Sequence, residues 1–487
     1  MKLTIRRYQH ILTKSPLLLC GLLLGLSATS IVHAAASEPA HVLTLEGALK
    51  LATEKNETLQ AYDKLKEAAE FKSASADLEL SPYLSAKAGL YDDKKLTLQP
   101  AFQGDRTQAK QISLGMAKKF ESGTSAQLSY GDQFTEISGT SFPIPAYWNS
   151  SLSLGLSQNL WKNAFGRSTR LRHEREQQIA KIETLAQIHQ AKNLRLQIEQ
   201  AYWTYIFAKE DKRLKEESLK RAERLLQWTS KRVSNGLADR SDFLQVNALL
   251  GSRSLQLISA DDDAKAAQKT LETFLATDLT SFKIEDDLRH ARLIKIEIGM
   301  LRMDALLSVL EAAVKSKAVE EAADGLNPDL NLLASLATNG QKATFGSSLG
   351  AVSDTTHPTW SMGVEFTLNL DRAQTHKVTQ ALSLESTAAR LKAQTAKRDS
   401  DTSRTELLRR HEELNSRISQ AEKLLDIQRE KAARERDRLE RGRTVTFQVI
   451  NFEQEQSEAE ALLLKLLTEQ RKLEATSALF VPENFGG

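Results

Sequence analysis

Residues 168–234 and residues 373–441 contain neither proline nor glycine. Since these two residues most often end or break a helix, each stretch predicts one continuous helix. At about 1.5 Å per residue, such a helix is roughly 100 Å long. Helices of this length need other surfaces of the protein to cover their apolar side chains.

The first of these stretches carries apolar residues at three- and four-residue steps. This spacing places them on one side of a helix, as in a coiled coil, with charged residues elsewhere. On the helices alone, a soluble coiled coil is the simplest interpretation. The seam consists of Ile179, Ile182, Leu185, Ile188, Leu196, Ile198, Tyr202 and Ile206.

The chain also contains an internal duplication. Leu-x-Pro-x-Leu occurs at residues 80–84 and again at 326–330, each time after a helical pattern and before an alternating stretch. Each long helix then ends near a glycine, Gly236 or Gly442, and a return helix follows. A repeated unit of this length constrains the whole fold. We therefore expect a signal segment over 1–36, a first repeat over 37–275, a connection over 276–299, a second repeat over 300–479 and a tail over 480–487.

A period of two marks the strands. In residues 360–370 (WSMGVEFTLNL), apolar and polar residues alternate, which predicts a strand with one apolar and one polar face. Similar stretches occupy 84–90, 151–160 and 326–336. Two more, 111–120 and 124–130, flank a Glu-Ser-Gly turn and predict an extra hairpin.

Such a sheet needs a cover for its apolar face. The long helices leave from the strand ends, so lipid is the alternative to a soluble core, and a sheet in lipid must close on itself. Four strands cannot close, but three chains would supply about 12, or about 18 if the hairpin 111–130 joins the barrel. We expect lipid to contact Trp360, Met362, Val364, Phe366 and Leu368, and water in the lumen to contact Ser361, Glu365 and Thr367.

The N-terminus has the pattern of a secretory signal peptide. Lys2, Arg6, Arg7 and Lys14 precede an apolar run from Pro16 to Leu26 and small residues near Ala36. Lipidation of the one cysteine, Cys20, is not expected, because Leu19 precedes it where a small residue belongs. Removing the four basic residues changes 66 Lys+Arg against 63 Asp+Glu to 62 against 63, a net charge of −1, which does not favour nucleic-acid binding.

The order and duplication of these motifs resemble the TolC family of outer-membrane factors. The resemblance rests on LTLEGALKLATEKNETL, on Leu-x-Pro-x-Leu twice, and on Gly-x5-[DQ]-[FV]-[LI]-[QN] twice. It implies a mainly α protein with a β-barrel, in which three chains form an outer-membrane barrel continued by a helical tunnel in the periplasm. It also implies a passive, gated exit duct for efflux or type I secretion, working with a periplasmic adaptor protein and an inner-membrane transporter.

The resemblance further implies that the helix–turn–helix tips close the tunnel with an acidic ring. The positions that match the ring are Gln448 and Asn451 in the second repeat and Asp242 and Gln245 in the first. Because only Asp242 is a carboxylate, we expect weak cation selectivity and weak block by trivalent cations. Tip or adaptor contacts are expected at Gly236, Gly442, Arg441, Arg443 and Asp239, with an arginine latch between protomers as one possibility.

No pattern in the sequence predicts an enzyme. The His residues lack metal-ligand spacing, and phosphate-loop and nucleophile-elbow motifs are absent, so neither a cofactor nor a metal is expected. The acidic run 261–263 lies in a charged helical context and indicates a solvated face. The competing interpretation is a soluble periplasmic coiled-coil protein with a structural or adaptor role. Drug, metal and protein substrates are not distinguished.

Overall fold

The computed structural model describes residues 41–94, 96–141, 143–280, 282–284, 286, 288, 301–354 and 357–481. Residues 42–487 group as one unit. The expected signal segment with Cys20, most of the connection 276–299, and residues 482–487 lie outside the described residues.

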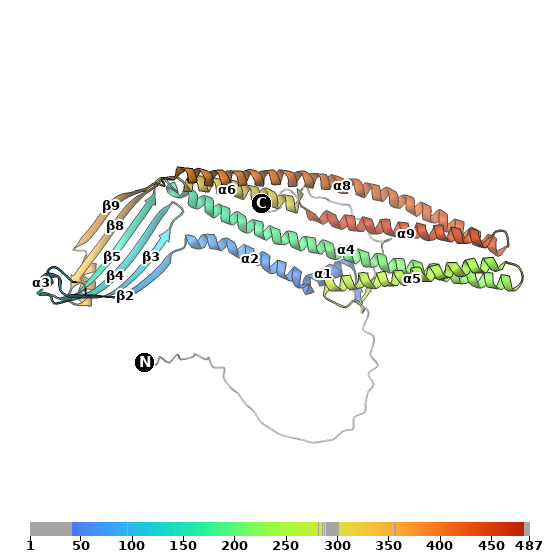
Figure 1. The fold of residues 1–487 in the computed structure, drawn as a ribbon, viewed down its shortest axis with the longest axis horizontal. Coiled ribbons are helices and arrows are strands. Elements are labelled where there is room, and N and C mark those ends of the chain that lie inside the picture. Colours follow the sequence, from blue (N-terminus) through green and yellow to red (C-terminus); the bar gives the residue numbers. More distant parts are fainter. Residues whose placement is uncertain are drawn as a thin grey trace, which may run out of the picture. The chain divides into compact units, whose positions relative to one another are not determined.

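Both expected long helices are present. They are α4 (Arg167–Ser234) and α8 (Arg372–Glu440), and each is followed by an antiparallel return helix, α5 (Arg240–Leu275) or α9 (Thr446–Thr476). Figure 1 shows the two hairpins side by side, with their tips at the end opposite the sheet. We call the turns 235–239 and 441–445 the tips.

The helical pattern that precedes the first Leu-x-Pro-x-Leu motif does not form one continuous helix. The structure has α1 (Leu45–Lys55) and α2 (Glu57–Glu79), because Asn56 leaves the helical conformation between them. Its side-chain oxygen accepts from the amides of Thr58 and Leu59, and its Nδ2 donates to the carbonyl of Phe274 at 2.8 Å. Asn56 therefore caps α2 while it attaches the helix to α5. The counterpart in the second repeat is α6 (Met303–Gly325).

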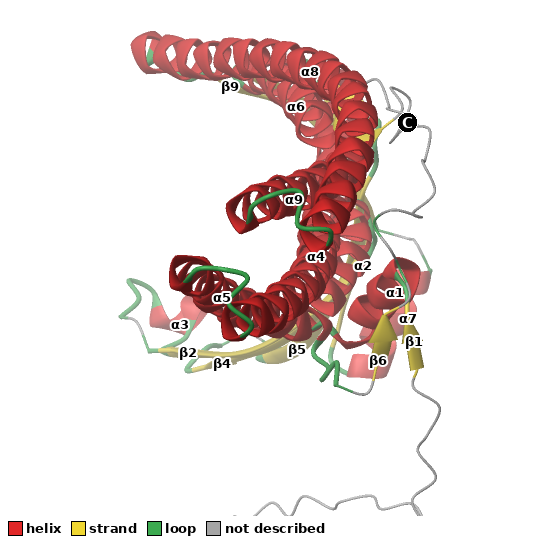
Figure 2. Cartoon of the chain, turned by 90° about the vertical axis from the view of Figure 1, so that its right-hand side faces the viewer, coloured by secondary structure: helices red, strands yellow, loops and turns green. Residues whose placement is uncertain are grey.

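The main core lies where α1, α4, α5, α8 and α9 meet. It includes the fully buried Ile198, Tyr202, Ile206 and Leu271, so the last three residues of the predicted seam of α4 are part of this core. The Tyr202 hydroxyl donates to Asp286 Oδ2 at 2.7 Å, and the amide of Leu45 donates to the same oxygen at 2.8 Å. Viewed from the tips, the helices form a curved wall (Figure 2).

One antiparallel sheet continues from the helices. Its order is β2-β3-β4-β5-β8-β9, and the strands alternate in direction. The expected hairpin lies inside the sheet, between the strands of the first repeat, so each chain contributes six strands to it. The bounds are β2 (Tyr83–Asp93), β3 (Arg106–Lys119), β4 (Thr124–Ser138), β5 (Ala146–Asn159), β8 (Asp329–Lys342) and β9 (Pro358–Thr367).

The strand expected at 360–370 ends earlier than its alternation indicates. β9 stops at Thr367, so Leu368 and Leu370 lie beyond it. Asn369 Oδ1 accepts from the amide of Asp371, and Asp371 in turn caps α8 by accepting from the amide of Gln374. These hydrogen bonds turn the chain from strand to helix and end the alternation.

Smaller elements complete the described chain. Two short sheets pair β1 (His41–Leu43) with β6 (Phe282–Ile284) and β7 (Leu301–Arg302) with β10 (Phe480–Val481). The short helices are α3 (Pro100–Gln103), α7 (Phe345–Ser353), η1 (Ala164–Gly166) and η2 (Ser477–Leu479). None of the described helices combines the length and the hydropathy required to cross a membrane.

Candidate functional site

The even-numbered residues of the strands form one face of the sheet, and most of them are apolar. The strand register aligns these side chains from one edge of the sheet to the other. They are solvent-exposed in the single chain: Leu84 at one edge is 76% exposed and Trp360 at the other 75%. One complete row consists of Leu84, Met116, Leu128, Leu154, Leu336 and Trp360.

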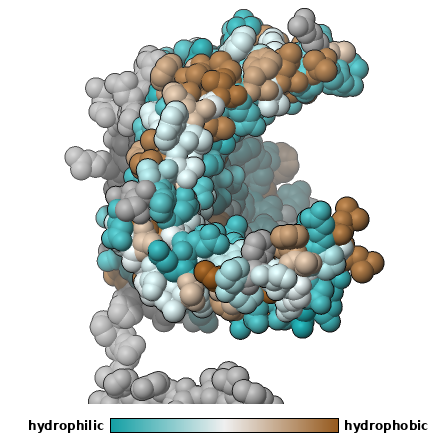
Figure 3. All heavy atoms as spheres, turned by 90° about the vertical axis from the view of Figure 1, so that its left-hand side faces the viewer, coloured by the Kyte–Doolittle hydropathy of each residue, from teal (hydrophilic) through white to brown (hydrophobic). Residues whose placement is uncertain are grey.

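The opposite face is polar and made of small residues. A row from edge to edge contains Ser85, Gly115, Ser129, Ser153, Ala337 and Thr359. The Ser129 and Ser153 hydroxyls lie 2.7 Å apart. The predicted lumen residues Ser361, Glu365 and Thr367 lie on this face, and the predicted lipid residues Met362 and Val364 lie on the apolar face by alternation. Figure 3, viewed from the sheet end, shows hydrophilic residues lining much of the hollow of residues 42–487.

Helix α7 covers one end of the apolar face, a feature that sequence reasoning missed. The Ser348 hydroxyl is fully buried, donates to the carbonyl of Gly340 at 2.6 Å and accepts from the amide of Ser150 at 3.1 Å. A Cβ at Gly340 would lie 2.3 Å from the carbonyl oxygen of Ser348. The close packing of α7 on β5 and β8 therefore requires glycine at 340.

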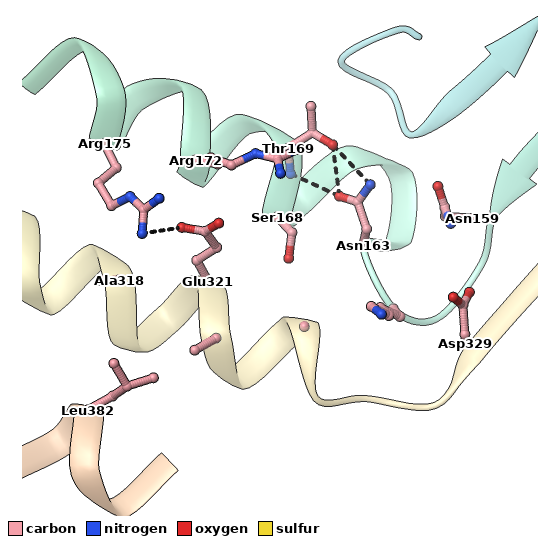
Figure 4. Close-up of a pocket in the computed structure, with 13 residues that line it drawn as sticks. Asn159, Asn163, Ser168, Thr169, Arg172, Arg175, Ala318, Glu321, Asp329 and Leu382 are labelled. Carbon is pink, nitrogen blue, oxygen red and sulfur yellow. Dashed lines mark hydrogen bonds and ion pairs between the residues drawn. The ribbon is translucent and has the colours of Figure 1, made fainter. Parts of the chain in front are cut away.

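At the other end, a polar junction joins the sheet to the helices. Asp324, at the end of α6, is buried and accepts from the amide of Asn163 and the hydroxyl of Ser168. Asn163 Oδ1 accepts from the amide of Thr169 at 2.9 Å (Figure 4). Arg175 pairs with Glu321 at 3.0 Å across a pocket of about 460 Å³. These contacts fix the start of α4 against the end of α6.

The backbone of this junction is tightly constrained. Asn163, Phe165 and Gly166 all have positive φ. A Cβ at Gly166 would lie 1.5 Å from the carbonyl oxygen of Glu121 in the β3–β4 turn. Only glycine fits at this position, so the junction holds the hairpin turn as well as α4.

The two tips have the same backbone cap. Gly236 and Gly442 have φ of 72° and 69°. At one tip the amide of Leu237 donates to the carbonyl of Arg232 at 2.8 Å, and at the other the amide of Arg443 donates to the carbonyl of Arg438 at 2.9 Å. This is the Schellman pattern, in which glycine supplies the left-handed residue after a helix.

The four predicted constriction residues lie in the first two turns of the return helices. Asp242 and Gln245 are on α5, and Gln448 and Asn451 are on α9. Three are half-buried and Gln245 is exposed. Asp239 is the N-cap residue of α5, although its side chain makes no capping hydrogen bond.

Two arginines near the tips, Arg441 and Arg232, make different contacts. Arg441 pairs with Asp437 of its own helix at 2.7 Å. Arg232, which the sequence did not single out, donates to the carbonyl of Leu237 at 3.0 Å and reaches the carbonyl of Leu439 on α8 at 3.5 Å. Its guanidinium also lies 4.8 Å from the centre of the Trp228 ring. Arg232 therefore connects the two hairpins near their tips.

Apolar packing supports this connection. Leu225 and Val246 of the first hairpin and Leu439 and Val449 of the second form one buried cluster, which we call the tip cluster. Val246 and Val449 each follow a predicted constriction residue by one position. The helices that carry the predicted constriction residues are therefore packed into a common core.

A buried charged layer lies next to the tip cluster. Glu453 and Glu460 of α9 are almost fully buried. Arg436 approaches Glu453 at 3.6 Å, and Arg429 and Arg221 approach Glu460 at 3.3 and 3.7 Å. Burial raises the pKa of Glu453 above its ordinary value, while the surrounding arginines oppose that shift.

Comparison with solved structures identifies the fold. No known protein-family model matches the sequence, and no curated protein is similar to it in sequence. The structure, however, is similar to that of the transmembrane channel protein CusC, with a TM-score of 0.65, 14% identity, and 90% of this chain and 92% of that chain covered.

Two further channels show the same similarity. For the outer-membrane protein VceC of Vibrio cholerae, the TM-score is 0.64 at 14% identity, covering 89% of this chain and 94% of that chain. For the MtrE outer-membrane channel of Neisseria gonorrhoeae in its open state, it is 0.61 at 18% identity, covering 89% and 88%. The chain therefore has the fold of these outer-membrane channels, and the expected fold is confirmed.

Proposed function

We propose that this protein is a passive exit duct of the outer membrane, related to the TolC family and not an enzyme. Three copies close their sheets into one barrel, and their helices form a tunnel through the periplasm. The observation that carries the proposal is the sheet itself. Six strands present an exposed apolar face and a polar face, and they continue directly into helices of about 100 Å.

The size of the apolar face supports lipid as its cover. Exposed apolar patches of this extent are rare on monomeric soluble proteins. The soluble coiled-coil alternative needs a second layer over this face, and among the described elements only the nine-residue α7 packs there, at one end.

The tips are the proposed gate. The four predicted gate residues follow the tips in the return helices, and the tip cluster and Arg232 connect the two hairpins there. Exposed apolar residues at the same end, including Leu237, Leu244, Val445 and Phe447, offer a contact surface for a periplasmic adaptor protein that links the duct to an inner-membrane transporter. Efflux and type I secretion are both compatible with such a duct.

The test is conductance of the detergent-purified protein in a planar lipid bilayer. We expect discrete channels that are mostly closed and that open when the tips are weakened, for example by Arg232→Ala. The protein should also be released from cell envelopes only by detergent, as a trimer. Release without detergent as a monomer or dimer, with no conductance, would support the soluble alternative.

A further inference from the structure

The sheet has two open edges. Among the described strands, β2 and β9 each have a single neighbour, so their outer edges present backbone donors and acceptors with no strand beside them. Every residue of β9 is exposed in the single chain. In a membrane these edges must be covered by other strands. Given the proposed function, the strands available are those of another copy of the chain.

The strand directions permit only one kind of contact between copies. The six strands alternate in direction, so β9 of one copy runs antiparallel to β2 of the next. Odd-numbered residues of both strands lie on the polar face. Antiparallel pairing that keeps both faces continuous therefore places odd-numbered residues opposite odd-numbered residues.

The shear of the sheet sets the register. The row of paired residues that starts at Tyr83, at the helix end of β2, reaches β9 at Ser361, although β9 continues to Thr367. The helix-side ends thus shift by 6 residues (367 − 361) over the five steps from β2 to β9. At the same shift per strand, the total shift is about 7 residues over the six steps from β2 of one copy to β2 of the next.

The duplication gives a second measure of the same shear. The row from Leu84 reaches Leu336 in β8, whereas the repeat counterpart of Leu84 is Leu330. The shift is 6 residues (336 − 330) over four steps, or about 9 over six steps. Because the faces must stay continuous, the shift has to be even, and 8 is the even value between these two totals.

We infer that β2 of one copy pairs with β9 of the next so that Lys87 lies directly opposite Glu365. A shift of 8 places residue 369 (361 + 8) opposite Tyr83, and hence Glu365 opposite Lys87. Lys87 and Glu365 are the only charged residues of the described polar face away from strand ends, and neither forms an ion pair with another described residue. Each is on an edge strand, and their charges are complementary.

The neighbouring pairs fit the same register. On the apolar face, Phe366 meets Ala86 and Val364 meets Ala88, so large side chains oppose small ones. In this register every residue of β9 lies opposite a residue of β2 or opposite Lys94, which follows β2. A slip by two residues would place Gly363 opposite Lys87 and separate the charges. The Lys87–Glu365 pair therefore specifies the register of β9 against β2 at each contact between copies.

Cysteine cross-linking of the full chain in outer membranes tests the pairing. Directly opposite residues have Cβ atoms about 4.5–5.5 Å apart, close to disulfide geometry. We expect K87C/E365C to give disulfide-linked dimers and trimers that a reductant converts back to monomers. The yield of these cross-linked species should be at least fivefold higher than for K87C/G363C or K87C/T367C. K87C/S113C, opposite each other within one sheet, is the control that oxidises without a change in mass. A stronger ladder from either shifted pair would overturn the register.

Charge reversal gives an independent readout. K87E and E365K should each lower the temperature at which the trimer dissociates on a detergent gel, and K87E/E365K should restore it. A double variant no more stable than the single variants would show that the charges do not meet. A conducting trimer with another register would overturn only the proposed pairing of Lys87 with Glu365. The absence of both trimer and conductance would overturn the proposed function.

Discussion

At the scale of the residue, alternation decides which solvent each side chain meets. Val364 and Thr367 lie three positions apart on β9, on opposite faces. Both are exposed in the single chain, so burial alone does not distinguish them. The distinction comes from alternation along β9 and from the paired strand: Val364 lies opposite Leu332, whereas Thr367 lies opposite Asp329.

Val364→Arg should therefore damage assembly in the membrane. A charge on the lipid face of a barrel costs about 2–4 kcal/mol near the bilayer midplane. We expect less detergent-extracted trimer, measured by a native gel of outer membranes. Thr367→Arg is the matched control and should assemble normally but alter conductance. Equal loss of trimer from both variants would contradict the assignment of faces.

Glu453 provides a pH-dependent prediction. Its pKa is raised in the folded protein from an ordinary value of 4.5, chiefly by burial. The folded state therefore binds the proton more tightly, and the resulting stability is present at low pH and is lost as pH rises through the folded pKa. Glu453→Gln should melt higher than wild type near neutral pH and show a flatter pH dependence above 4.5.

Thermal melting at several pH values measures this effect. Glu458→Gln, an exposed change on the same helix, is the control and should leave the profile unchanged. If Glu453→Gln melts lower at neutral pH, the ion pair with Arg436 at 3.6 Å outweighs the cost of burial.

At the scale of the element, the tips repeat one cap at two places in the chain. Gly236→Ala with Gly442→Ala should destabilise both tips, because a left-handed conformation costs a residue with a Cβ roughly 1–2 kcal/mol. We expect a higher open probability in single-channel recordings. Gly251→Ala, in the interior of α5, is the matched control and should leave gating unchanged or stabilise the helix.

Elements defined by local periodicity were predictable from the sequence. The long helices begin and end within a residue of the expected positions, because each is free of proline and glycine over its length and ends next to Gly236 or Gly442. The break at Asn56, the packing of α7 and the buried layer around Glu453 and Glu460 were not predicted. Each depends on partners distant in sequence, such as the carbonyl of Phe274 for Asn56 or Arg221 for Glu460. The insertion of the hairpin into the sheet likewise depends on strand pairing.

At the scale of the whole molecule, six strands per chain would give three copies a barrel of 18 strands. Replacing residues 94–145 by a short turn joins β2 directly to β5 with direction and faces preserved. Because barrel diameter grows roughly linearly with strand number, the lumen area should fall by about half. In a variant with weakened tips, single-channel conductance should decrease accordingly. An unchanged conductance would place the limiting resistance in the helical tunnel.

Ion selectivity tests the tips within the assembled duct. Gln448 and Asn451 are uncharged, so we expect weak cation selectivity and weak block by trivalent cations. Q448E/N451D should increase both, measured by the reversal potential in a salt gradient. Q245E, on the return helix of the other repeat, is the comparison. Strong cation selectivity of the wild-type channel would count against the assigned constriction.

The uninterrupted helix α4 has a mechanical consequence. Its 68 residues, without proline or glycine, make a stiff rod of about 100 Å. Its sheet end is fixed by Asp324, Asn163 and Gly166, so a rotation of the sheet end is passed on to the whole rod. A rotation of about 3° at the sheet end moves the far end about 5 Å sideways over that length. In the proposed duct, a small rotation at the sheet end would thus become a displacement of about 5 Å at the tips.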